Sequence, residues 1–202
     1  IGGVETGRFT RAIAAIDARN ADDPHTLLID GVAQPKELTH ARMVTDWVRR
    51  LRPDASEALL LAARAHHLRR WAIPRDSYPQ GRVPYLQWRR ALQDLHAREL
   101  RDILTAEGYE AATIDRAEWI LRKRDLKTDP EVQALENAIC LVFLQTQFLD
   151  TARKLERAKM VDILRKTLQK MTGPGKQAAL QLDLNDEERQ LLAEALATAP
   201  AP

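Results

Sequence analysis

The stretch SEALLLAARAHHLRRWA, residues 56–72, is the clearest helical segment of the sequence. It is rich in Ala and Leu, which are strong helix formers, and it begins with a serine, a residue type that commonly caps the first turn of a helix. Pro53 and Pro74 stand just outside its two ends, where proline discourages a helix from continuing. We therefore expect a helix over residues 56–72.

The same helical periodicity extends in both directions from this stretch, with Pro and Gly at the breaks. Asp129 followed by Pro130 is a typical helix start, and Gly173 is expected to close the helix before it. Helices are predicted over residues 7–20, 36–51, 56–72, 84–107, 111–125, 130–154, 157–171 and 186–197. The fold class that follows is all-α, a single compact multi-helix domain. We expect residues 1–182 to form it, and residues 183–202 to form an acidic C-terminal helix and tail packed on it or trailing from it.

Composition excludes several classes of protein. The 202 residues include 8 Gly, 10 Pro and a single Cys, which argues against fibrous and disulfide-stapled chains. No apolar run is long enough for a membrane span, and the start lacks the apolar core of a signal peptide. The net charge of +2 argues against a general nucleic-acid binder. Cys140 lies in an apolar run and is expected to be a buried free thiol, so we expect a cytoplasmic protein that spans no membrane.

Four polar side chains fall on apolar faces of the predicted helices. Apolar residues stand at helical spacing around each of them, so each is expected to point into the core. The four are His40, His67, His96 and Glu136. A single buried histidine is most often a satisfied core hydrogen bond. Four such groups on separate helices would be costly to bury without partners, so we expect them to meet one another or to hold one divalent metal ion.

The spacing of these residues resembles the HD superfamily of metal-dependent phosphohydrolases. That superfamily has a His on one helix, a His-Asp pair ending the next and a late Asp; here His40, the pair His66-His67 and Glu136 take those places. His67 stands where the pair has Asp, and Glu136 stands where the late Asp is expected. The resemblance implies an HD-like fold, while these departures favour a single-ion or metal-free site over a two-metal centre.

A second resemblance covers nearly the whole chain. The strings RAHHLRRW at 64–71, IPR at 73–75, YLQWR at 85–89, KRDLK at 123–127 and LENAICLVFL at 135–144 are similar to an uncharacterised family, the domain of unknown function DUF4202. In that family Gln-His is usual at the position of His66-His67, and position 40 is not regularly His. The resemblance therefore makes His67 a better candidate ligand than His66.

Arginine is concentrated around the histidine pair. Eight arginines lie between Arg64 and Arg98 against two aspartates, interleaved with Tyr and Trp. Guanidinium groups bind phosphate in bidentate fashion and aromatic rings stack on planar ligands, although arginines on a solvated helix face would show the same pattern. The candidate phosphate-binding residues are Arg69, Arg75, Arg89, Lys123 and Lys127.

Two functions fit these features. The first is a divergent HD-like metal-dependent phosphohydrolase that acts on a small phosphorylated or nucleotide substrate. His40, His67, His96 and Glu136 would hold the ion, and His66 or His96 would transfer a proton. We expect the imidazoles of His67 and His96 and the carboxylate of Glu136 to converge within roughly 8 Å. The alternative is a catalytically inert helical domain that binds a ligand or a protein partner through the arginine and aromatic residues.

Overall fold

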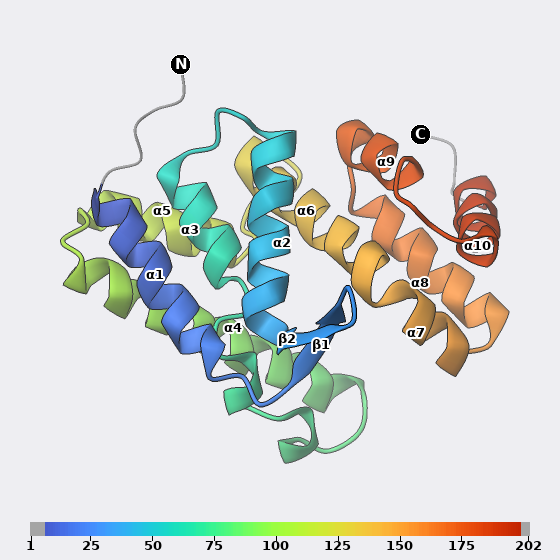
Figure 1. Ribbon diagram of the computed structural model, residues 1–202, viewed down its shortest axis with the longest axis horizontal. Coiled ribbons are helices and arrows are strands. Elements are labelled where there is room, and N and C mark those ends of the chain that lie inside the picture. Colours follow the sequence, from blue (N-terminus) through green and yellow to red (C-terminus); the bar gives the residue numbers. More distant parts are fainter. Residues whose placement is uncertain (1–6, 199–202) are drawn as a thin grey trace.

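The computed structural model describes residues 7–198 and confirms the all-α class (Figure 1). The described chain is helical apart from one two-stranded antiparallel hairpin. Its elements are α1 (Gly7–Ala21), β1 (Thr26–Ile29), β2 (Val32–Pro35), α2 (Lys36–Leu51), α3 (Glu57–Ala65), the short 3-10 turns η1 (Arg70–Ala72) and η2 (Arg75–Ser77), α4 (Arg82–Ala106), α5 (Ala111–Leu121), α6 (Pro130–Thr146), α7 (Phe148–Lys154), α8 (Arg157–Gln169), α9 (Gly173–Leu180) and α10 (Asp186–Ala197).

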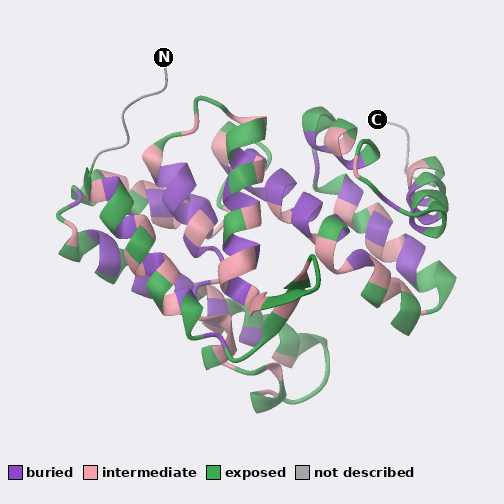
Figure 2. Cartoon of the chain, viewed as in Figure 1, coloured by how far each residue is buried: buried purple, intermediate pink, exposed green. Residues whose placement is uncertain are grey.

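Two clusters of buried apolar side chains hold these helices together. The first lies among α1 to α5 and the first half of α6, and the almost entirely apolar α3 is at its centre (Figure 2). The second joins the last half of α6 to α7, α8, α9 and α10. Trp47 and Leu51 of α2 pack against both clusters. Helix α6 therefore belongs to both halves, and the groove beside it is where the candidate site is found.

The predicted acidic helix at the C-terminus is α10. Leu191, Leu192 and Ala195 are buried in the second cluster, and α10 packs against α8. Asn185 caps it by accepting a hydrogen bond from the Glu188 backbone N–H, and the Glu188 carboxylate accepts one from the Asn185 backbone N–H. Residues 1–6 of the predicted domain and residues 199–202 of the predicted tail lie outside the described residues. The division at residue 182 stays a prediction.

The predicted ends of two helices were wrong, and both corrections affect the site. Helix α3 ends at Ala65 rather than at 72, because the Arg69 N–H donates to Asn20 Oδ1 and Arg69 adopts a left-handed backbone (φ 53°). Helix α5 ends at Leu121 rather than at 125, because Lys123 is also left-handed (φ 55°). His67 therefore lies in the turn after α3 and not on the face of that helix.

The helix predicted over 130–154 is broken at Gln147 into α6 and α7. The bend of 62° turns the fully buried Phe148 into the second core cluster. No single helix within the described residues is long and apolar enough to cross a membrane. The α6 and α7 pair passes that test of length and composition only when the two are taken together across the bend.

The hairpin and α9 were not predicted. Asp30 and Gly31 both have positive φ, as the two central residues of a type I′ turn require, and Asp-Gly is a typical sequence for that turn. The expectation that Gly173 closes a helix was wrong, because α8 ends at Gln169 and Gly173 begins α9. Any side chain at Gly175 would meet Asn137 of α6, since an added Cβ would lie only 2.7 Å from its side chain. Because glycine has no side chain at this position, α9 can approach α6 closely.

Candidate metal and phosphate site

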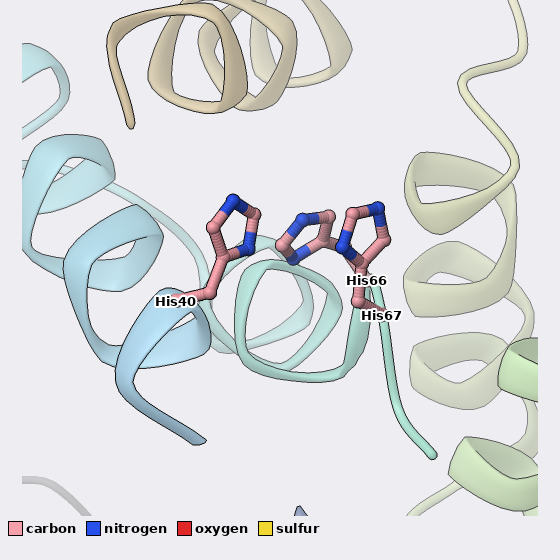
Figure 3. A group of neighbouring side chains, drawn as sticks. All are labelled: His40, His66 and His67. Atoms are coloured by element: carbon pink, nitrogen blue, oxygen red, sulfur yellow. The ribbon is translucent and has the colours of Figure 1, made fainter. Parts of the chain in front are cut away.

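Three histidine rings from two segments of the chain lie together, those of His40 and His66 buried and that of His67 half-buried (Figure 3). His40 comes from α2, and His66 and His67 follow the end of α3. The ring centroid of His40 is 5.0 Å from that of His66 and 5.1 Å from that of His67, and the last two centroids are 4.0 Å apart. One nitrogen from each ring lies within 4.8 Å of the others. Ligand atoms on one tetrahedral zinc ion lie about 3.3 Å apart, so a small closure would bring these nitrogens onto one ion.

Two of these rings carry buried nitrogen atoms that have no hydrogen-bond partner. His40 Nδ1 and His66 Nε2 are both inaccessible and unpaired. His66 Nδ1 lies 3.1 Å from the Ala63 carbonyl oxygen. Because a carbonyl can only accept, His66 donates from Nδ1 and its Nε2 carries a free lone pair. This is the arrangement in which metal-ligating histidines are usually oriented.

His96 of α4 is the fourth histidine of the group. Its ring centroid is 6.0 Å from that of His67, and its Nδ1 donates to the Leu68 carbonyl at 2.7 Å. This bond joins α4 to the turn that carries His67 and leaves the Nε2 of His96 as an acceptor. His96 therefore orients the turn and offers a nitrogen beside the three-histidine group.

Burial disfavours the charged form of all four imidazoles, although the side chain of His67 is only half-buried. Burial lowers the pKa of His40 and of His96, the latter to about 4. Burial and the neighbouring imidazoles lower the pKa of His66 and of His67 well below the ordinary value. The neutral imidazole is the form that ligates a metal ion, so the group needs no proton release to bind one.

Glu37 adds a carboxylate that the sequence interpretation missed. Its Oε2 lies 3.3 Å from His67 Nδ1, and its Oε1 lies 4.0 Å from the guanidinium of Arg70. The backbone N–H of Glu37 donates to Asp23 Oδ2 at 2.8 Å, which fixes the first turn of α2 where Pro35 supplies no side-chain cap. The available signal was the spacing Glu37-x-x-His40, which places both side chains on one face of a helix.

A cavity of about 620 Å³ opens beside the histidines, between α4, α6 and α8. His66, His67 and His96 form part of its wall. The cationic side chains that line it are Arg70, Arg89, Arg90, Lys123 and Lys170. Among its described lining residues the only carboxylate is Glu136. The excess of positive charge suits an anionic ligand.

Glu136 lies in the cavity wall but outside the three-histidine group. Its Oε2 is 2.7 Å from Lys123 Nζ, and the side chain is buried. Lys123, whose backbone is left-handed, contacts this carboxylate from the turn that follows α5. Cys140 Sγ lies 3.9 Å from Glu136 Oε1, and burial followed by the charge of Glu136 raises the pKa of this thiol to about 12. The prediction that Cys140 is a buried free thiol is confirmed.

The predicted phosphate-binding residues are divided between several places. Arg89 and Lys123 line the cavity. Arg69 is 2.7 Å from Glu99, and Arg75 donates to the carbonyls of Tyr78 and Pro79; neither lines this cavity. Lys127 lines a separate cavity of about 330 Å³ beside α6. Three further cavity cations, Arg70, Arg90 and Lys170, were not selected from the sequence, because residue order does not show which side of a helix faces a groove.

Residues 10–192 match the model of a family described as a domain of unknown function (DUF4202). The matched range includes every histidine and carboxylate of the site. No curated protein and no solved structure shows significant similarity to the chain.

Proposed function

The chain belongs to the DUF4202 family, and we propose that it is a metal-dependent hydrolase acting on a small phosphorylated substrate. One observation supports this most strongly. Three mutually close imidazoles, two of them with buried and unpaired nitrogens, stand beside a cavity whose wall carries five cations. Unpaired polar atoms are costly to bury, so this arrangement is more consistent with ligand binding than with stability alone.

The residues fit one divalent transition-metal ion. Imidazole nitrogens suit zinc, iron, cobalt and nickel better than magnesium or calcium, which prefer oxygen. His40, His66 and His67 would hold the ion, and three protein ligands are typical of catalytic sites that keep one position open. A bound ion of this kind supplies Lewis acidity that activates water and polarises a phosphoryl oxygen. The fold likeness to the HD superfamily stays a prediction, and the proposed site does not depend on it.

The other cavity residues have separate roles in this proposal. Arg70, Arg89 and Arg90 would bind the phosphate, since guanidinium groups match its oxygens in bidentate fashion. His96, with its Nδ1 committed to the Leu68 carbonyl, would accept or deliver a proton at Nε2. The apolar wall formed by Leu86, Ile139, Phe143 and Ile163 would contact the part of the substrate that carries no charge.

An inert anion-binding domain is the alternative function. The ion pair between Lys123 and Glu136 favours it, because the Glu136 carboxylate, a metal ligand in the sequence-based prediction, is paired with an amino group instead. In that case the cavity would bind a phosphorylated ligand without cleaving it.

Metal analysis and an activity screen on purified, untagged protein test the proposal. We expect a divalent ion to copurify, or to raise the melting temperature at modest excess, and we expect hydrolysis of at least one phosphate monoester or diester. His67→Ala should remove both effects. His25→Ala is the matched control, because His25 is exposed and lies outside the group. Absence of any metal effect and of hydrolysis in wild type would contradict the proposal. Phosphate binding without hydrolysis would support the alternative.

A further inference from the structure

We propose that Glu37 is a fourth ligand of the metal site, so that three imidazoles and one carboxylate hold the ion and a fifth position stays open for water or phosphate. This inference rests on the proposed function, because it requires that the histidine group bind a metal. It adds a residue that the resemblance to the HD superfamily does not supply, since that pattern has no carboxylate one turn before the first histidine.

The strongest evidence is a coincidence of unpaired buried atoms. Glu37 Oε2, His40 Nδ1 and His66 Nε2 are all inaccessible and have no hydrogen-bond partner. Glu37 Oε2 lies 3.3 Å from His67 Nδ1, which is about the spacing of two ligand atoms on one tetrahedral ion. The three-histidine group itself is already close enough to share an ion. Glu37 lies outside the set of ligand atoms that are within 4.8 Å of one another, so its carboxylate must turn towards His40 and His66 for a single cation to contact all four residues.

The charge of Glu37 is also less well compensated than that of comparable carboxylates. Glu99 lies 2.7 Å from Arg69 and 2.8 Å from Arg19, and Glu136 lies 2.7 Å from Lys123. Glu37 is as deeply buried as these, with a side chain only 6% exposed, yet its distance to Arg70 is 4.0 Å. A buried carboxylate needs close compensation, and a divalent ion would provide it.

The backbone around Glu37 is held in place before any ligand arrives. Asp23 Oδ2 accepts from the N–H of Glu37, and the N–H of the preceding Lys36 donates to the His25 carbonyl at 2.9 Å. Both bonds join the start of α2 to the segment before the hairpin. Glu37 and His40 are one helical turn apart, so the same helix presents both side chains to the ion. With the backbone held in this way, a rotation of the Glu37 side chain towards the histidine group is the movement that the proposal requires.

Metal affinity in isosteric variants tests the assignment. Metal-stripped wild type, Glu37→Gln and Glu99→Gln would be titrated with zinc against a chromogenic chelator. We expect Glu37→Gln to weaken zinc binding by at least about tenfold, as loss of a ligand or of its close support does. Glu99→Gln is the matched control, a buried carboxylate with other partners, and should bind zinc as wild type does.

The melting temperature without metal separates a ligand from a structural ion pair. If Glu37 awaits a cation, Glu37→Gln removes a poorly compensated charge, and the metal-free variant should melt at the same temperature as wild type or about 2–4 °C higher. If Glu37 serves mainly to pair with Arg70, the metal-free variant should melt lower than wild type, which would overturn the inference.

A thiolate at the same position gives a direct spectroscopic readout. With cobalt as the probe, Glu37→Cys should show a sulfur-to-cobalt charge-transfer band that wild type, which already contains Cys140, lacks. Equal zinc affinity in wild type and Glu37→Gln, or no such band in a cobalt-bound Glu37→Cys protein, would overturn the role of Glu37 and leave the proposed function standing. Absence of metal binding in wild type would overturn the proposed function itself.

Discussion

The two ends of α3 are built in opposite ways. At its N-terminus, Ser56 caps the helix and its hydroxyl also donates to Glu131 at 2.7 Å. Arg116 extends this network, because it donates to both Asp129 and Glu131. At the C-terminus of the same helix, the buried atoms His40 Nδ1, His66 Nε2 and Glu37 Oε2 have no hydrogen-bond partner. We call these the paired end and the histidine end.

The contrast shows which polar groups serve stability and which serve a ligand. A satisfied network stabilises a fold and defines the positions of the helices around it, whereas unpaired buried groups lower stability. Such groups are kept where function requires them, and their cost is offset elsewhere in the structure. The same helix therefore has a structural end and a candidate functional end, and the difference between them can be measured.

The contributions of the two ends to stability should differ most in the pH range over which each is lost. In the metal-free chain, the pKa of each of the four grouped histidines is below its unfolded value of about 6.5, so the unfolded chain takes up protons first as the pH falls. Stability should be full above about pH 7 and should fall as the pH drops below about 6.5, by up to about 1.4 kcal/mol per pH unit for each histidine. For His96 this fall should end near its folded pKa of about 4.

The paired end should respond only at lower pH. Its hydrogen bonds with Arg116 lower the pKa of Asp129, so the contribution of this carboxylate is present above its unfolded pKa of about 3.9 and is lost as the pH falls further. Urea denaturation across a pH series measures both ranges. A metal-free stability that stays constant from pH 7 to pH 5 would contradict the description of the histidine end.

Metal ions should change the stability of the histidine end and leave the paired end unaffected. At a free concentration one hundred times the dissociation constant, a divalent ion should stabilise the wild type by about 2.7 kcal/mol. The same addition should stabilise an Asp129→Ala protein equally, because that residue takes no part in the site. Calorimetric melting with and without zinc provides the measurement, and a smaller metal effect in Asp129→Ala would mean that the two ends are coupled.

Removal of the cap at the paired end should lower stability by a smaller amount. Asp129→Ala deletes the acceptor for the N–H groups of Glu131 and Val132 and the partner of Arg116, so we expect a loss of about 1–2 kcal/mol in urea denaturation. Asp54→Ala is the control, since Asp54 forms an exposed ion pair with Arg52, and its loss should change stability far less than the loss of Asp129 does. Equal effects of the two substitutions would remove the distinction between this network and ordinary surface ion pairs.

The smallest effect on folding should come from the histidine end itself. His66→Leu replaces a poorly satisfied polar ring with an apolar side chain, so the metal-free stability should change by less than about 1 kcal/mol or should rise. The same variant should lose metal-induced stabilisation. A large loss of metal-free stability would indicate that His66 is a structural residue after all.

Much of the helical framework could be predicted from the sequence, because local signals determine it. The predicted bounds 36–51 and 186–197 coincide with α2 and α10, and the caps at Ser56 and Asp129 are present. The predictions failed where a distant residue competes with the helix. The side-chain oxygen of Asn20 accepts a hydrogen bond from the Arg69 N–H and so helps to end α3, although Asn20 lies 49 residues earlier in the chain.

The candidate site was predictable only in part, for a related reason. Helical spacing identified His40 and His96 as residues that face the interior, and both are buried. It selected His67 on a helix that ends before it, yet the His67 ring lies 5.1 Å from that of His40 and 6.0 Å from that of His96. It also selected Glu136, whose carboxylate the structure places 2.7 Å from Lys123. Glu37 was missed because a glutamate in the first turn of a helix is ordinary in sequence terms. Only the folded chain shows that it is buried beside imidazoles.

The hairpin before α2 has a practical consequence for experiments. The N–H groups of Lys36 and Glu37, at the start of α2, donate to the His25 carbonyl and to Asp23 and so close the segment at its base. Asp30 and Gly31 at its tip are exposed. Because the base is closed independently of the tip, inserted residues should add little loop-closure entropy and should leave Glu37 in place. The Asp30–Gly31 turn is therefore a suitable position for a fluorophore or an affinity tag that reports on the site from outside it.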